Sequence, residues 1–225
     1  MTMNTFNNIK SLFQSVFSDI LKEDDSYEIG EAALPAYTHK NPLIDWLFWK
    51  RIKVAYRFGK ATNTPKAILD FGCGSGVLSY LLAQQDHMIT SCDVEFRPLN
   101  QIKNKIDFPA NIVFIEGDIL DMNMPDESYD IIYALDVLEH IEDLDAYIVL
   151  FSKLLKPDGL IIVSGPTENI FYKIGRKIAG NRFTGDYHVT NISKIKAAFQ
   201  RHMEVKSVKK IQFPIYLFEI FTANN

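Results

Sequence analysis

Apolar residues recur with two different periods along this chain of 225 residues, and the change of period divides the chain into regions. Over residues 6–21 they fall three or four positions apart, which is the spacing of one face of an amphipathic helix. Asn41 and Pro42 are typical of a helix cap and a first helical residue, and predict a second helix that continues to about Phe58. The sequence therefore predicts an N-terminal helical extension over residues 1–65.

From Lys66 onward, short apolar runs alternate with amphipathic segments, a pattern that predicts βαβ units and a parallel sheet. The expected strands are Ala67–Phe71, Met88–Asp93, Ile112–Gly117, Tyr129–Leu135 and Leu160–Ser164. The expected helices are Gly76–Gln85, Arg97–Lys105 and Leu144–Leu155, with a tight turn over residues 156–159 after the last. The fold class is accordingly α/β, with a doubly wound, mostly parallel sheet.

The C-terminal part departs from this alternation. A less regular insertion covers about residues 166–189, and a helix is expected over Asn191–Gln200. Two apolar runs follow, Val205–Gln212 and Ile215–Thr222, with only two residues between them. Because parallel strands need a much longer connection, these two runs predict an antiparallel hairpin that closes a domain of residues 66–225.

Composition narrows the class of protein. The chain is 47% hydrophobic with a formal charge of −4, so it is expected to fold as a globular protein with no general attraction to nucleic acid. It has neither a signal-peptide pattern nor a run of roughly 18 apolar residues, and a cytoplasmic location is expected. Cys73 and Cys92 are therefore expected to be reduced thiols, and the cysteines and histidines show no spacing of a metal site.

A glycine-rich loop is the strongest candidate for chemistry. The strand that ends near Asp70 is followed by the loop 72–76 (GCGSG) and then a helix, which places bare backbone at the edge where open α/β sheets bind ligands. A dinucleotide-binding loop has a glycine or alanine three positions after its second glycine, and here that position is Val77. The loop therefore argues against a nicotinamide-dependent oxidoreductase.

Acidic residues end four successive predicted strands: Asp70, Asp93, Asp118 and Asp136. Four carboxylates at one rim would repel a pyrophosphate but suit a ligand with a positive charge and ribose hydroxyls. Asp93 stands at about the distance from the loop expected for the acid that binds a ribose. Asp118 is expected to accept from an adenine amino group, although a turn or helix-cap aspartate is the simpler alternative.

Five segments between Ile68 and about Pro166 share their order with one known family: ILDFGCGSG, CDVE, EGDILDM, YDIIYALDVLEHIED and LLKPDGLIIVSGP. In these motifs the chain resembles the class I S-adenosylmethionine-dependent methyltransferases, especially the small-molecule branch that includes the ubiquinone-biosynthesis O-methyltransferases. The resemblance implies a seven-stranded sheet with an antiparallel last strand, and S-adenosylmethionine as methyl donor with S-adenosylhomocysteine as product. The cofactor-binding residues that it implies are Asp70, Gly72, Cys73, Gly74, Gly76, Asp93, Val94, Asp118, Ile119 and Leu135.

The resemblance is incomplete in the N-terminal region. Where the family often has an arginine after an Asn-Pro-Leu sequence, this chain has Ile44. Tyr37, His39 and Lys40 are the substitutes that we consider for recognition of the cofactor carboxylate. A proton acceptor for a hydroxyl substrate is expected to be His188, in the insertion, or His140, for which a packing or capping role is the alternative.

Substrate selection is expected to lie outside the glycine loop. The candidate substrate residues are Tyr37, Trp46 and Tyr187. Trp46 belongs to the helix after Asn41, which is rich in aromatic residues and either lines a substrate pocket or is simply packed between neighbours. Residues 170–182 mix basic and aromatic side chains, as in a peripheral membrane contact, a solvated helix face or an anion site.

The function that the sequence predicts is methyl transfer to a small molecule, at oxygen. Two alternatives stay open. One is a noncatalytic module that keeps the fold, and the other is a methyltransferase that acts on a membrane-associated lipid or quinone precursor.

Overall fold

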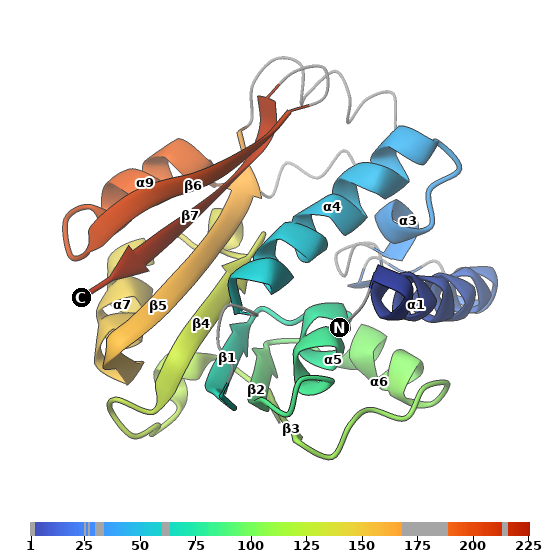
Figure 1. Cartoon of the computed structure of the whole chain (residues 1–225), viewed down its shortest axis with the longest axis horizontal. Coiled ribbons are helices and arrows are strands. Elements are labelled where there is room, and N and C mark those ends of the chain that lie inside the picture. The colour runs from blue at the N-terminus through green and yellow to red at the C-terminus, as the bar shows by residue number, and fades with distance from the viewer. Residues whose placement is uncertain are drawn as a thin grey trace. The chain divides into compact units, whose positions relative to one another are not determined.

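The structure is a computed structural model that describes residues 3–24, 26, 28–29, 34–59, 64–167, 189–212 and 216–225 (Figure 1). Three sequence predictions lie outside the described residues: the roles of Tyr187 and His188, and the membrane contact of residues 170–182.

Seven strands form one sheet in the order β3-β2-β1-β4-β5-β7-β6. The strands are β1 (Ala67–Phe71), β2 (Met88–Asp93), β3 (Ile112–Glu116), β4 (Tyr129–Leu135), β5 (Leu155–Pro166), β6 (Glu204–Gln212) and β7 (Tyr216–Asn224). The pairs β2–β3, β1–β4 and β4–β5 are parallel, whereas β7 is antiparallel to both β5 and β6. The predicted fold class, including the antiparallel last strand, is confirmed.

The largest difference from the predicted bounds is in β5. The expected turn at residues 156–159 and strand Leu160–Ser164 are parts of one longer strand, because Leu155 already pairs with Tyr129 of β4. The next ladder position pairs Leu160 with Ile131, so the ladder shifts register and residues 156–159 form a bulge. A Cβ added at Gly159 would lie 2.6 Å from the Leu155 side chain, so the bulge needs a glycine there.

By its internal contacts the chain divides into two compact units. Unit 1 comprises residues 1–65 and 73–117, and unit 2 comprises residues 66–72 and 118–225. The contacts therefore group the N-terminal helices with residues 73–117, which contain β2 and β3. The predicted boundary at residue 65 marks the start of β1, which belongs to unit 2, and the proposed role of residues 1–65 as a separate cover stays a prediction.

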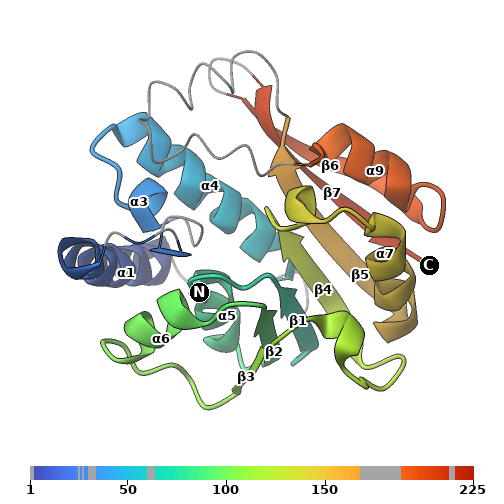
Figure 2. The same cartoon turned by 180° about the vertical axis from the view of Figure 1, so that it is seen from behind.

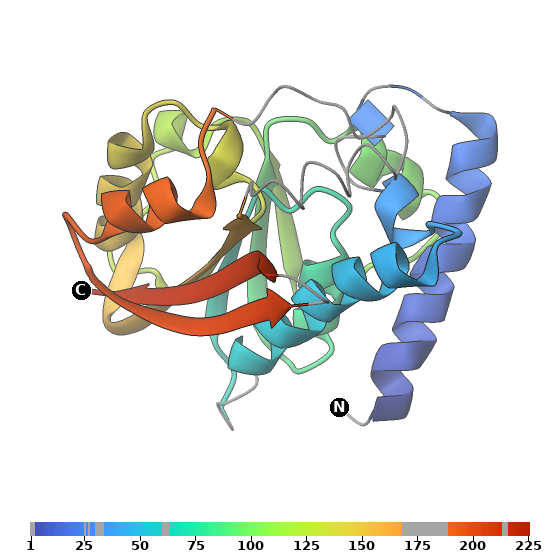
Figure 3. The ribbon, with the colours of Figure 1, turned by 90° about the horizontal axis from the view of Figure 1, so that it is seen from above.

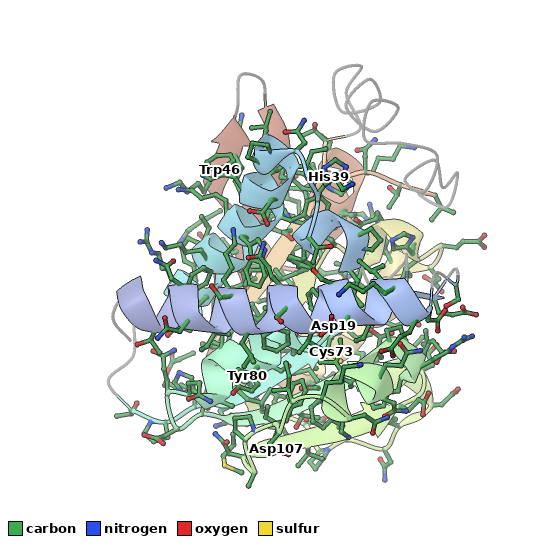
Figure 4. The ribbon with its side chains drawn as sticks, turned by 90° about the vertical axis from the view of Figure 1, so that its right-hand side faces the viewer. Asp19, His39, Trp46, Cys73, Tyr80 and Asp107 are labelled. Atoms are coloured by element: carbon green, nitrogen blue, oxygen red, sulfur yellow. The ribbon has the colours of Figure 1, made fainter. Side chains whose placement is uncertain are left out.

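Unit 1 is built around a long helix, α1 (Met3–Glu23), which packs against α3 (Leu34–Tyr37), α5 (Val77–Ala83) and α6 (Arg97–Lys103). The helix α4 (Pro42–Gly59) packs against α3 and α5. Figure 4 shows α1 crossing the unit, with α3 and α4 on one side and α5 and α6 on the other. Edge-to-face rings join these helices, since Phe13 contacts both Tyr80 of α5 and Phe108.

The start of α4 follows the predicted cap. The Asn41 side chain accepts a hydrogen bond from the Leu43 amide at 2.9 Å, and Pro42 is the first helical residue. The short helix α3, which contains Pro35, was not predicted because four residues are too few for a helical period to emerge.

In unit 2, two helices cover one face of the strands β5, β7 and β6: α7 (Leu144–Leu154) and α9 (Ile192–Phe199). Figure 2 brings this face forward, and Figure 3 shows both helices on the same side of β6 and β7. Phe199 of α9 packs edge-to-face on Phe221 of β7, with ring centroids 5.4 Å apart. Across the described residues, the structure contains no helix with the length and hydrophobicity needed to span a membrane.

Candidate functional site

Three glycines shape the loop that follows β1. Gly72, Gly74 and Gly76 have φ angles of 69°, 49° and 70°, in the left-handed region that residues with a side chain seldom adopt. Gly76 also caps α5, which begins at Val77. The turn from strand to helix thus needs glycine at all three positions because of backbone conformation.

Space around the three glycines differs. A Cβ at Gly72 would lie 2.4 Å from a methyl group of Val137, and a Cβ at Gly76 would lie 3.0 Å from Leu99 and Phe108. Among the residues that the structure describes, none lies within 4 Å of a Cβ at Gly74. Gly72 and Gly76 are therefore held against the protein itself, and Gly74 is the glycine with room for a ligand against its backbone.

Asp93, at the end of β2, is bonded to this loop. Its Oδ2 accepts from the Gly74 amide at 2.7 Å, and its Oδ1 accepts from the Val94 amide at 2.8 Å. Burial raises the pKa of Asp93 above its usual value, although the amides of Gly74, Val94 and Glu95 act in the opposite direction. The carboxylate is thus fixed by backbone donors while keeping lone pairs for further donors such as ribose hydroxyls.

Two neighbouring residues have opposite environments. The Cys73 side chain is buried in an apolar cluster with Phe96, Leu99, Phe108 and Phe114. Its amide donates to the Cys92 carbonyl at 3.1 Å, and neither Cys73 nor Cys92 is in a disulfide bond. Cys73 can therefore meet a ligand only through its backbone. Val94, by contrast, is 70% exposed and presents an apolar side chain beside Asp93.

Asp118 caps the short helix η1 (Ile119–Asp121), as the simpler sequence interpretation has it. Its Oδ1 accepts from the Leu120 amide at 2.9 Å, and its Oδ2 accepts from the Tyr147 hydroxyl at 2.7 Å. Ile119, one of the cofactor-binding residues that the resemblance implies, is fully buried, whereas Leu120 is 43% exposed. The accessible apolar side chain next to Asp118 is therefore Leu120.

The end of β4 supplies further predicted residues. Leu135 is half-buried, and Asp136 follows it with a φ of 55°, its amide bonded to the Ser164 carbonyl at 3.1 Å. His140 is exposed at the end of η2 (Leu138–His140). Asp70 is almost fully buried near the end of β1, where it pairs in register with Tyr133 of β4.

The candidate residues of the N-terminal region lie in different environments. Tyr37 is buried among Phe17, Phe48 and Trp49, and its carbonyl accepts from the Trp49 indole at 3.1 Å. These contacts join Tyr37 of α3 to α1 and α4, and its role toward the substrate stays a prediction. Trp46 is 39% exposed on α4, and Figure 4 places it and His39 on the opposite side of α1 from Cys73 and Tyr80.

His39 is engaged locally. Its Nδ1 accepts from the Asn41 amide at 3.0 Å, at the start of α4. The structure therefore gives His39 a role in the helix cap, and recognition of a carboxylate by Tyr37, His39 or Lys40 stays a prediction.

Two residues near the predicted acids were missed from the sequence. Val137 contacts Gly72, and Tyr147 contacts Asp118. Tyr147 lies 29 positions beyond Asp118, so no local spacing links them. The sequence indicates only that Tyr147 lies near the start of α7, the helix that follows β4.

Comparison with known proteins gives these features a family. Residues 69–163 match the family model described as a methyltransferase domain. The chain is 33% identical over 113 residues to the ubiquinone biosynthesis O-methyltransferase of Pasteurella multocida, an alignment that covers 45% of this chain and 46% of that protein. The enzyme of the same name from Haemophilus ducreyi is 31% identical over 105 residues, and covers 44% of each chain. The chain spans about half the length of the curated relatives it matches.

Solved structures support the fold over more of the chain. The N-methyltransferase NodS of Bradyrhizobium japonicum, in complex with S-adenosylhomocysteine, has a TM-score of 0.65 at 18% identity and covers 95% of this chain and 98% of its own. The magnesium protoporphyrin IX methyltransferase of Synechocystis, with bound S-adenosylhomocysteine, has a TM-score of 0.64 at 18% identity, with 94% and 98% covered. At this identity the likeness shows the fold alone.

Fold and family match together define a class I S-adenosylmethionine-dependent methyltransferase domain in this chain. Within that class the chain is distantly homologous to the ubiquinone biosynthesis O-methyltransferases. The family prediction is confirmed, and the individual contact residues stay predictions.

Proposed function

We propose that this protein transfers a methyl group from S-adenosylmethionine to a small-molecule acceptor, at oxygen. The family match over residues 69–163 supports the reaction class, and the homology to O-methyltransferases supports oxygen as the acceptor atom. The acceptor itself is proposed only as a small molecule, because the matched relatives share about half of their length with this chain.

The observation that carries the proposal is the pairing of Gly74 with Asp93. An open backbone position is bonded to a carboxylate that keeps free lone pairs, an arrangement that fits a ligand with ribose hydroxyls. We propose Asp93 as the ribose acid, with the exposed Val94 beside it. The remaining proposed binding residues are Asp70, Gly72, Cys73, Gly76, Asp118, Ile119 and Leu135, of which Cys73 would act through its backbone.

Methyl transfer requires the protein mainly to position the donor and the acceptor. When bound, the sulfonium donor supplies an activated methyl group for in-line displacement. The residues of this chain would hold the donor, exclude water and accept a proton from a hydroxyl acceptor. For the last task we propose His188 or His140, since imidazole titrates near neutral pH.

Calorimetry with S-adenosylhomocysteine tests the binding step. We expect binding in the micromolar range by the wild type and its loss in Asp93→Ala. Asp107→Ala is the matched control, because Asp107 is an exposed aspartate of the same unit. No binding heat from folded wild-type protein would refute the proposed function.

The catalytic step needs a separate measurement. We expect formation of S-adenosylhomocysteine from S-adenosylmethionine when phenolic or carboxylic acceptors are supplied, and a lower kcat in His188→Ala or His140→Ala with unchanged affinity for S-adenosylhomocysteine. Tight binding with no turnover across such a panel would instead favour the noncatalytic module. Turnover that requires acceptors embedded in vesicles would favour a lipid or quinone precursor.

A further inference from the structure

Tyr147 combines a fixed ring with a hydroxyl group aimed at a proposed binding residue. Its ring lies 5.5 Å from that of Phe71 and 6.4 Å from that of Phe151, and the latter two lie 5.1 Å from each other. Phe71 and Phe151 are buried. The three rings therefore join α7 to the last residue of β1 and hold the Tyr147 side chain in one orientation.

The hydroxyl of this anchored ring determines how Asp118 is oriented. The Tyr147 hydroxyl donates to Oδ2 at 2.7 Å while the Leu120 amide donates to Oδ1 at 2.9 Å. Two donors on different oxygens fix both the position and the plane of the carboxylate. Since an ionised carboxyl group offers about four lone-pair sites, roughly two remain for a ligand.

The charges around the phenol keep it a donor. Burial, the hydrogen bond to Asp118 and the negative charges of Asp118, Asp121 and Asp143 all raise the pKa of Tyr147. The hydroxyl group is thus protonated throughout the pH range in which the protein is expected to work, and Asp118 remains the acceptor of the pair.

We propose that Tyr147 is a positioning residue that orients the Asp118 carboxylate toward the exocyclic amino group of the donor's adenine, and so sets the preference for adenine over a deaminated base. This inference rests on the proposed function, because it assumes that the donor binds beside Asp118. A base with a carbonyl at the same position offers an acceptor to an acceptor, so an oriented carboxylate rejects it.

Two probes separate orientation from general support of the fold: S-adenosylhomocysteine, and S-inosylhomocysteine, in which a carbonyl replaces the amino group. We expect the wild type to prefer the adenine probe. Tyr147→Phe is expected to weaken binding of that probe about tenfold, as for a hydrogen bond to a charged group, and to change binding of the inosine probe less than about twofold. The preference for adenine should therefore shrink by about the same tenfold factor.

Control variants complete the test. Tyr80→Phe removes a hydroxyl group from another tyrosine that is packed among aromatic rings, and should leave the preference unchanged. In an Asp118→Asn background, Tyr147→Phe should have no further effect on the preference. Circular dichroism and thermal unfolding verify that each variant is folded.

The outcomes are distinguishable. Equal weakening of both probes in Tyr147→Phe, or no change in either, would overturn the role of Tyr147 while the proposed function stands. A folded wild type that binds neither probe would overturn the proposed function and this inference with it.

Discussion

Gly72 and Gly74 stand two positions apart in one loop, and the structure predicts different consequences for the same substitution. Both have a left-handed φ, so an alanine at either position is strained by roughly 1–2 kcal/mol. Replacing glycine by alanine also restricts the unfolded chain, which offsets about 0.4–1 kcal/mol of that strain. On backbone conformation alone, the two variants would be nearly equal in stability.

Packing separates them. The new Cβ of Gly72→Ala would lie 2.4 Å from Cγ2 and 2.6 Å from Cβ of Val137, overlaps that require the surroundings to move. Overpacking of this kind costs about 1–3 kcal/mol, so Gly72→Ala should lose about 1–5 kcal/mol of unfolding free energy in total. Gly74→Ala meets no such neighbour in the described part of the chain and should lose about 1 kcal/mol or less.

Gly74→Ala, the less destabilising of the two variants, is the one that should weaken ligand binding directly. The Cβ of Gly74→Ala projects into the space that we propose the ligand fills, so affinity for S-adenosylhomocysteine should fall at least about tenfold with the fold almost intact. Urea denaturation followed by circular dichroism measures the stability of each variant, and calorimetry measures its affinity.

A double-mutant cycle checks the physical cause. Val137→Ala removes the two methyl groups but keeps the Cβ that lies 2.6 Å away, so it should restore only about 1 kcal/mol to Gly72→Ala. If Gly74→Ala proved the more destabilising variant, or if Val137→Ala gave no coupling with Gly72→Ala, the assignment of separate roles to the two glycines would be refuted.

Three further predictions concern charged groups. Because burial raises the pKa of Asp93, affinity for S-adenosylhomocysteine should fall as pH is lowered through a value above 3.8, and a pH titration of Asp93→Asn should lack that step. Burial alone would raise the pKa of Asp130, but the Ala67 amide and the Lys156 ammonium lower it. Its stabilisation is therefore present above pH about 4 and lost as pH falls through the lowered pKa, so Asp130→Asn should be about 1 kcal/mol less stable at pH 7 and show a flatter acid unfolding curve. Lys196→Ala removes the 2.8 Å ion pair of the buried Glu219 carboxylate and should lower the unfolding free energy, measured by urea denaturation, by about 2–4 kcal/mol. The double variant Lys196→Met with Glu219→Gln should recover most of this loss. An unchanged stability of Lys196→Ala would contradict this prediction.

Agreement between sequence and structure is closest where the pattern is local. The bounds of β1, β2 and β4 follow from apolar runs of five to seven residues ended by an acid or glycine, and the structure has the same bounds. The bulge of β5 differs because Leu155 pairs with Tyr129, a contact that depends on a strand more than 25 positions earlier. Pro157 and Gly159 are typical of a turn, so the local sequence predicts a turn there. It does not show that Leu155 pairs with Tyr129.

In the candidate site, too, the features that depend on local sequence were predicted, and the features that depend on distant contacts were not. The sequence by itself determined the glycine loop, the succession of acidic strand ends and the class of ligand, because each depends on residue types at fixed spacing. The tertiary structure alone decided which glycine has open space, that Cys73 and Ile119 turn their side chains into the protein, and that Tyr147 holds Asp118. Those facts arise from contacts between residues far apart in the chain, and a side chain's exposure is set by the neighbours that folding brings to it.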